Sequence, residues 1–373
     1  MNKIIFKTIL TVVGLTFLFI PAISRADQAA NEPETFKAKV IEVMAVKEIT
    51  REDGSKFKQQ NLKLQGLEGK WKGKEIIYNG ISDIEVADAG FYKTGDKVFV
   101  EGYTDESGEM VYYVVDFVRS GYIYLLTAIF VIMTLLVGRF KGFKALLSLF
   151  ASFIIIIKFI LPQILAGRDP FLISLIGSLV ILAIIIYLTE GFNKKSHLAV
   201  LSVLISLFVT LILSVIFADL TRLTGFSQEE SAFLIGVGQA VINFKGLLLA
   251  GFIIGAVGVL DDIIIGQIEA VEQIKEANPN LPSGKVFILA YRVGNAHLGA
   301  IINTLFLTYV GASLPLLLLF VLNTNGVTFS RLINTEIVST EIVRTLVGSI
   351  GVILSMPIAT FLASLKSKKS ITK

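Results

Sequence analysis

The sequence contains no cysteine among its 373 residues. That absence excludes disulfide frameworks, thiol nucleophiles and cysteine-ligated metals. Charged residues are also scarce, at 17%, whereas soluble domains carry about 25%. The sequence contains no HExxH motif, no GxSxG motif in a strand–turn–helix context and no Walker A motif, which are typical of soluble enzymes. It therefore predicts neither an enzyme nor a bound cofactor or metal.

Apolar residues dominate the sequence instead. Hydrophobic residues make up 54% of it, and its mean hydropathy is +0.74, which is the composition of a membrane protein. The net charge is +4, yet residues 27–119 hold 13 Lys and Arg against 18 Asp and Glu, so the basic excess lies elsewhere. In membrane proteins such an excess marks cytoplasmic loops. No RNP motif, zinc finger or basic patch with interleaved aromatics is present, so nucleic acid is not an expected partner.

Residues 1–26 predict a secretory signal sequence. Lys3 and Lys7 precede a largely apolar run at 8–20, Pro21 ends that run, and small residues follow before position 27. This run is short for a bilayer-spanning helix. An uncleaved signal anchor is the alternative, and both place the next segment outside the cytoplasm. A cysteine-free exported segment is more typical of a bacterial envelope than of a eukaryotic exterior.

Residues 27–119 predict a small β-rich extracytoplasmic domain. Five short alternating runs recur, and turn signals such as Asn79-Gly80 and Gly95-Asp96 separate them; the runs are 38–46, 61–64, 75–78, 97–101 and 110–117. Five short strands in such a length suit an OB-like barrel. A structural cap on the membrane part and a sensing domain are equal alternatives for its role.

Residues 120–365 predict a polytopic α-helical membrane domain with about seven spans. The expected spans are 122–138, 145–167, 171–189, 198–218, 246–265, 290–321 and 342–363. Lys and Arg gather in the segments between them that would face the cytoplasm and in a basic tail at 366–373, as the positive-inside rule requires. The C-terminus would then be cytoplasmic. Residues 231–245 fit a spanning, re-entrant or interfacial helix.

The fifth expected span carries carboxylates below a row of glycines. Gly251, Gly255, Gly258, Asp262 and Glu269 recur at three-and-four spacing, so they share one helix face. The glycines predict close helix packing. A charged group at bilayer depth costs several kcal/mol, about 3 on insertion scales, so the carboxylates predict a proton or cation site. The alternative is that they only mark the cytoplasmic end of the span.

The sixth expected span carries the complementary polar groups. Arg292, Asn295 and Asn303 share one face, and His297 and Thr304 lie on a neighbouring one. Arg292 is the expected counter-charge for a carboxylate of the fifth span, because a buried charge is tolerated best when paired. The amides, and a single histidine, can equally serve interhelical contacts. The predicted ion- or substrate-binding residues are Asp261, Asp262, Glu269, Arg292, Asn295, His297, Asn303 and Thr304.

Two long runs in these spans resemble the YibE/F-like family of bacterial multi-pass membrane proteins. They are LLLAGFIIGAVGVLDDIIIGQIEAV and YRVGNAHLGAIINTLFLTYVGASLPLLLLF, and the resemblance extends over about residues 122–363. The resemblance implies a plasma-membrane protein with an extracytoplasmic N-terminal region. Members of the family are described as permeases because of their architecture.

The expected function is therefore a permease or exporter of unknown substrate, coupled to protons or cations. Its expected partners are the lipid bilayer and a small molecule or ion; a homo-oligomer or an envelope protein partner stays open. The alternative is an envelope sensor, receptor or assembly factor that uses the extracytoplasmic domain.

Overall fold

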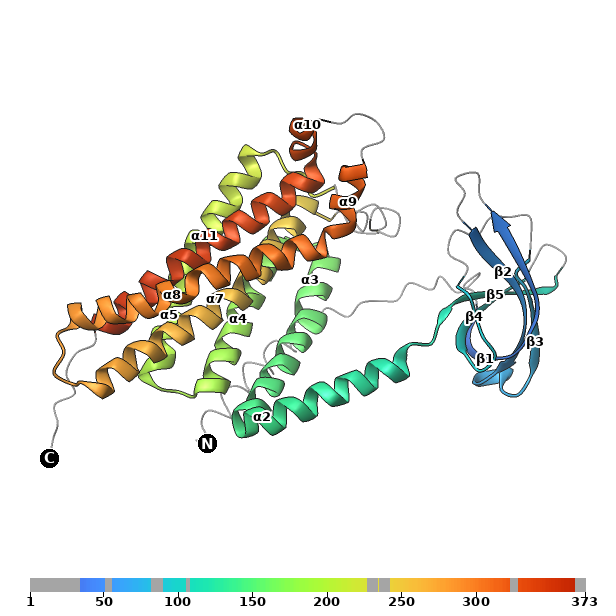
Figure 1. Cartoon of the computed structure of the whole chain (residues 1–373), viewed down its shortest axis with the longest axis horizontal. Coiled ribbons are helices and arrows are strands. Elements are labelled where there is room, and N and C mark those ends of the chain that lie inside the picture. Colours follow the sequence, from blue (N-terminus) through green and yellow to red (C-terminus); the bar gives the residue numbers. More distant parts are fainter. Residues whose placement is uncertain are drawn as a thin grey trace. The chain divides into compact units, whose positions relative to one another are not determined.

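The computed structural model describes residues 34–50, 56–81, 90–104, 108–226, 234, 242–322 and 328–365. These residues fall into two compact units, of which one ends at Thr134 and the other begins at Leu135 (Figure 1). The predicted signal sequence, the basic tail and most of residues 231–245 lie outside the described residues.

The first unit is built on a five-stranded antiparallel sheet with the order β3-β2-β1-β4-β5. Its strands are β1 (Glu34–Thr50), β2 (Lys56–Gly66), β3 (Glu75–Asn79), β4 (Lys97–Thr104) and β5 (Met110–Phe117). Each of the five predicted runs lies within one of these strands. The antiparallel β domain is therefore confirmed, while its likeness to an OB barrel stays a prediction.

Alternation along the strands builds the core of this sheet. Leu62 and Leu64 on β2 and Val98 and Val100 on β4 are fully buried, because every second side chain of a strand points to the same face. The core also holds Trp71, whose ring stacks on Phe36 at 4.9 Å between centroids and meets Tyr112 edge-on at 5.4 Å. This domain thus has a hydrophobic core of its own.

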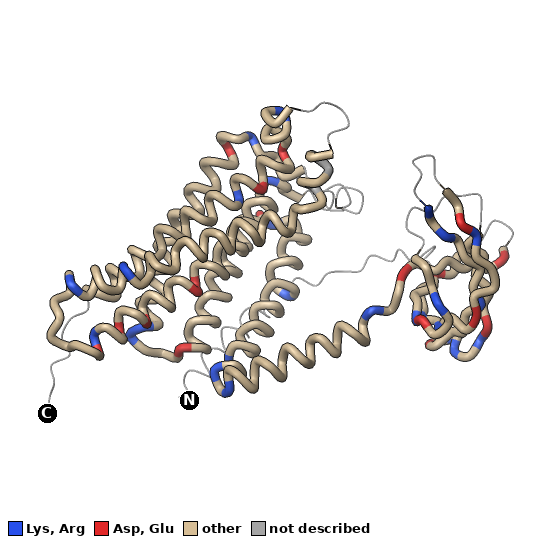
Figure 2. The backbone as a smooth tube through the Cα atoms, viewed as in Figure 1, with Lys and Arg blue, Asp and Glu red and all other residues tan. Residues whose placement is uncertain are grey.

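The second unit is helical, and it includes the part of the long helix α2 (Ser120–Ile155) from Leu135 onward. The helices are α2, a π-helical turn η2 (Ile156–Ile160), α3 (Leu161–Leu165), α4 (Pro170–Glu190), α5 (Lys194–Leu220), α7 (Phe244–Ala277), α8 (Ser283–Ala312), α9 (Leu314–Leu322), α10 (Phe329–Ile333) and α11 (Glu336–Leu365). Figure 2 shows long uncharged stretches in them, with most charged residues near helix ends. Such stretches are the mark of membrane-spanning segments.

Five helical stretches among the described residues are long and apolar enough to cross a membrane: Ser120–Leu165, α4, α5, α7 and α11. The first two expected spans lie together in Ser120–Leu165, where Arg139 (φ 46°, ψ −126°) interrupts the helical backbone. The sixth expected span corresponds to α8 and α9, and α8 is not among the five. The expected count of about seven therefore stays a prediction.

Helix starts follow the local sequence. The Asp169 side chain accepts a hydrogen bond from Leu172 N at the start of α4, and Pro170 occupies the first turn. Asn193 and Asn243 cap α5 and α7 in the same way. Such side chains satisfy backbone N–H groups that have no partner within the helix.

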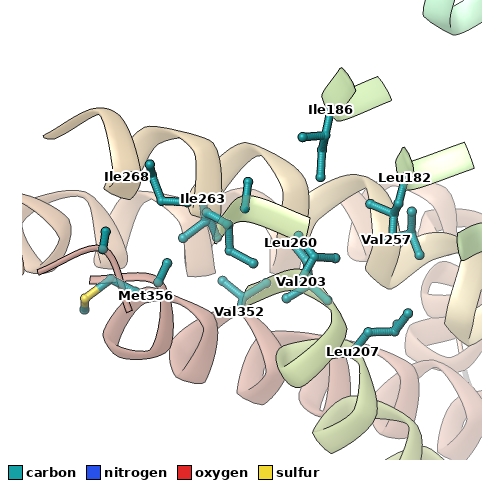
Figure 3. Close-up of a cluster of buried hydrophobic side chains, with 14 of the residues drawn as sticks. Leu182, Ile186, Val203, Leu207, Val257, Leu260, Ile263, Ile268, Val352 and Met356 are labelled. Atoms are coloured by element: carbon teal, nitrogen blue, oxygen red, sulfur yellow. The ribbon is translucent and has the colours of Figure 1, made fainter. Parts of the chain in front are cut away.

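Helix α7 lies at the centre of the bundle, packed against α4, α5, α8 and α11. Figure 3 shows apolar side chains of α4, α5, α7 and α11 gathered in one cluster, including Leu182, Val203, Leu260 and Val352. The close approach of α5 and α11 depends on a glycine, because a methyl group on Gly351 would lie 2.1 Å from Thr210 Oγ1. Small residues of this kind let membrane helices pack closely.

The predicted glycine row on α7 makes no close contact with another helix among the described residues. No described atom lies within 4 Å of a methyl group placed on Gly251 or Gly258, and one on Gly255 would make only an ordinary contact with Tyr309. Close helix contact is found instead at Gly294 and Gly351. With respect to the described residues, Gly251 and Gly258 therefore leave open space, and tight packing at these positions stays a prediction.

Candidate functional site

A cavity of about 630 Å³ lies between α7, α8 and α11. Its lining combines polar groups with apolar side chains and glycines: Gly255, Val259, Asp262, Ile263, Gly266 and Gln267 from α7, Val293, Gly294, His297, Leu298, Ile301, Thr304, Leu305, Thr308 and Tyr309 from α8, and Met356 from α11. Cavities of about 300–1,000 Å³ are the usual size of small-molecule sites.

The cavity is elongated because it follows two antiparallel helices. Gly255 of α7 lies opposite Tyr309 of α8 at one end, and Gln267 lies opposite Gly294 at the other. At 1.5 Å of rise per residue, the α7 segment from Gly255 to Gln267 spans about 18 Å. Asp262 lies between these ends, so the carboxylate faces the middle of the cavity.

The polar groups of the cavity are few. Thr304 Oγ1 donates a hydrogen bond to Ala300 O at 2.9 Å, and Thr308 Oγ1 donates one to Thr304 O at 2.7 Å. Because each hydroxyl proton is used within α8, these threonines offer mainly acceptor lone pairs to the cavity. Asp262 and His297 are therefore the principal groups able to bind a charged ligand.

Gln267 closes one end of the cavity and joins three helices. In the amide orientation that satisfies both its ends, Nε2 donates to Thr360 Oγ1 at 2.9 Å and to Ala290 O at 3.3 Å, and Oε1 accepts from Gly294 N at 3.2 Å. A methyl group on Gly294 would lie 2.1 Å from the end of this amide. Gly294 is thus the position that allows α8 to reach the buried Gln267.

Three of the eight predicted binding residues line this cavity: Asp262, His297 and Thr304. Arg292, Asn295 and Asn303 are not part of the lining. All six of these residues are exposed, so the difference between the two groups is the face of the helix and not their burial. The three-and-four spacing placed these residues on one face of α8, but that face is not the one that meets α7.

Asp261 lies beside Asp262 but does not line the cavity. Its side chain is buried, with 7% of the residue exposed. Oδ1 of Asp261 accepts no hydrogen bond from any residue that the structure describes. The two adjacent carboxylates therefore have different surroundings, one in the bundle core and one at the cavity.

Glu269 has a counter-charge other than the predicted Arg292. Lys195 Nζ lies 3.0 Å from Glu269 Oε2 and also forms an ion pair with Glu272. In the described part of the chain, Arg292 forms no ion pair with Glu269 or Asp262. This corrects the expected pairing and places Glu269 in a charged cluster with the start of α5.

Other features of the site were not predicted from the sequence. Gln267, Thr308, Tyr309 and Met356 line the cavity without having been identified. Among described residues, no group of three or more His, Asp or Glu side chains could hold a metal ion. The arrangement can bind a small ligand through one carboxylate, one imidazole and the three hydroxyl groups of Thr304, Thr308 and Tyr309.

Comparison with known proteins gives two family matches that together span most of the chain. The family described as YibE/F-like protein matches residues 126–369. The YibE/F family N-terminal domain matches residues 33–117, which include the five-stranded sheet. No curated protein and no solved structure matches the chain.

Proposed function

The chain belongs to the YibE/F-like family, and we propose that it is a membrane permease or exporter whose substrate path includes the cavity between α7, α8 and α11. Family membership and the apolar helices indicate a membrane protein. We propose the bacterial plasma membrane as its location, with the β domain outside and the C-terminus in the cytoplasm, because Lys and Arg gather in the segments that this topology puts inside.

The observation that carries the proposal is a carboxylate in an otherwise largely apolar cavity. A charged group in apolar surroundings is costly unless a cation or hydrogen bonds compensate it. Asp262 is the only acidic residue among the described residues of the lining. Its proposed role is to bind a proton or a cation, while His297 and Thr304 on α8 supply hydrogen-bonding groups.

The weak attachment of α8 also supports transport. Only Val286, Ala290, Gly294 and Leu305 are buried among the thirty residues of this helix. Helix α7 opposite is far more buried, with residues of its core cluster in contact with four helices. A transporter needs an element that can shift against a fixed one around a site near the middle of the membrane, and α8 is the least buried of the three helices that line the cavity.

The test is thermal unfolding of the purified protein in lipid nanodiscs, followed by the helical circular dichroism signal. The wild type should show a midpoint that depends on pH or on an added cation, since a ligand at about 100 times its dissociation constant stabilises by roughly 2.7 kcal/mol. This dependence should be absent in Asp262→Asn. Glu276→Gln is the matched control, because Glu276 is an exposed residue of the same helix outside the cavity. If Asp262→Asn kept the full dependence, the coupling role would be refuted.

A sensor or assembly factor is the second candidate function. It is favoured by the compact N-terminal unit, which has its own core. Trp71 is the only tryptophan of the chain and lies in this unit, so its fluorescence reports on that domain. A ligand that changes Trp71 fluorescence in Asp262→Asn as strongly as in the wild type would support sensing over transport.

A further inference from the structure

The charge of the cavity favours one class of ligand. Asp262 is its acidic group, and no lysine or arginine is among the described residues that line it. Two basic residues of the helical unit have other partners: Lys195 pairs with Glu269, and Lys275 Nζ donates to Ala363 O at 2.7 Å. A cation would therefore gain an ion pair here, whereas an anion would meet a like charge.

The walls of the cavity disfavour a bare divalent cation. Divalent cations such as Ca²⁺ require about six to eight oxygen ligands. Here one carboxylate and two threonine hydroxyls are surrounded by Val259, Ile263, Leu298, Ile301, Leu305 and Met356. Such walls suit hydrocarbon, because burying apolar surface stabilises by about 25 cal/mol per Å².

The shape of the cavity suits a chain-like ligand. Asp262 is seven residues from Gly255, which corresponds to about 10 Å along α7. Gly266 leaves open space on the α7 side, a methyl group on Gly255 would make only an ordinary contact with Tyr309, and Tyr309 ends the cavity beyond Gly255. A ligand with its charge at Asp262 could thus extend an apolar chain toward Tyr309.

We infer that the cavity binds an amphiphilic cation, namely an ammonium compound with an alkyl or arylalkyl body. Its ammonium group contacts Asp262, and its apolar body lies along the segment between Asp262 and Tyr309. This inference rests on the proposed function, since it names the substrate class for the same cavity. The competing occupant is a lipid acyl chain, which would bind with little regard to the charge of its head group.

The experiment uses three probes with one chain and different head groups: octylammonium, octanol and octanoate. Each is titrated against the full-length protein in nanodiscs, and the unfolding midpoint is read from the helical circular dichroism signal. Octylammonium should raise the midpoint of the wild type at a concentration on the order of tenfold lower than octanol, because an ion pair with Asp262 adds to the same apolar contact. Octanoate should bind more weakly than octanol.

Three variants locate the effect. Asp262→Asn should reduce the preference for octylammonium over octanol to about twofold or less, since a neutral amide binds an ammonium group more weakly than a carboxylate does. Asp261→Asn is the matched control and should keep the preference, because Asp261 does not line the cavity. Gly266→Leu should weaken all three probes by filling the cavity. It should leave the fold intact, since no described atom lies within 4 Å of a methyl group there and leucine favours helix.

The outcomes separate this inference from the proposed function. Equal binding of octanol and octylammonium to the wild type would identify an acyl-chain groove and overturn the inference, as would a charge preference that survives in Asp262→Asn. Absence of any shift would overturn it too. If octylammonium does not shift the unfolding midpoint while that midpoint still depends on pH or cations through Asp262, only the inference is refuted. If octylammonium binds at Asp262 but the midpoint does not depend on pH or cations, only the proposed coupling is refuted. Should Asp262→Asn not fold, Asp262→Glu must keep the preference and Gly266→Leu must lose binding.

Discussion

Substituting Gly294 by alanine should loosen helix α8 from the rest of the bundle. The new methyl group would lie 2.1 Å from the end of the Gln267 amide and 2.8 Å from Met356 Cγ. Both neighbours are buried and come from two other helices. Gln267 cannot move aside without losing its hydrogen bonds to Thr360 and to the backbone of α8.

The size of the effect follows from three opposing contributions. Replacing glycine by alanine within a helix stabilises by about 1 kcal/mol. Forcing extra volume into a packed site costs about 1–3 kcal/mol, and leaving a buried amide without hydrogen bonds costs about 1–3 kcal/mol more. Gly294→Ala should therefore lower the free energy of unfolding by about 1–5 kcal/mol.

Reversible unfolding in lipid nanodiscs measures this loss, and hydrogen exchange of the α8 amides shows whether it is local. Gly299→Ala is the matched control, because Gly299 lies in the same helix and no described atom lies within 4 Å of a methyl group there. The control should be unchanged or slightly more stable than the wild type. If Gly294→Ala were as stable as Gly299→Ala, the contact between Gln267 and Gly294 would not hold α8, and this reasoning would be wrong.

Three further predictions concern other parts of the chain. Asp261→Asn should raise the thermal midpoint, because a buried carboxylate oxygen without a described hydrogen bond costs more than a neutral amide; a lower midpoint would contradict this. Gly351→Ala should destabilise the packing of α5 on α11, since its methyl group would lie 2.1 Å from Thr210 Oγ1, and Thr210→Ala in the same chain should restore part of the loss. The hydrogen bond from Arg119 holds the pKa of Asp116 below its ordinary value of 3.8. The resulting stability is present above that value and is lost as pH falls through the lower folded pKa, so acid melts followed by tryptophan fluorescence should lose this contribution in Asp116→Asn.

The β domain could be predicted well because its core follows from alternation within single strands. Val98 and Val100 are buried while Lys97 is exposed, as the sequence pattern indicates. The helical part was harder. Arg139 lies one residue past the predicted end of the first span, so the position of this break was predicted, but its positive φ at a residue other than glycine was not.

The candidate site was only partly predictable because the cavity depends on which face of α8 meets α7. Asp262 was found as an ionisable residue in an apolar run, which is a local signal. Gln267 was missed because its role depends on Thr360, 93 residues away. The partner of Glu269 is Lys195, 74 residues away, whereas Arg292 was expected because it lies on the next span and a buried charge is tolerated best when paired.

Gln267 gives α8 a fixed point near Gly294, about which the helix would pivot if it moved. Three of its four buried residues, Val286, Ala290 and Gly294, lie in its first half, and Gln267 binds it at that point. From Gly294 to Tyr309 the helix extends about 22 Å. A tilt of about 10° around Gly294 would therefore move Tyr309 by about 4 Å and displace the residues opposite Asp262 by a smaller amount. Such a tilt of α8 would open the Gly255 end of the cavity first and leave the Gln267 end closed.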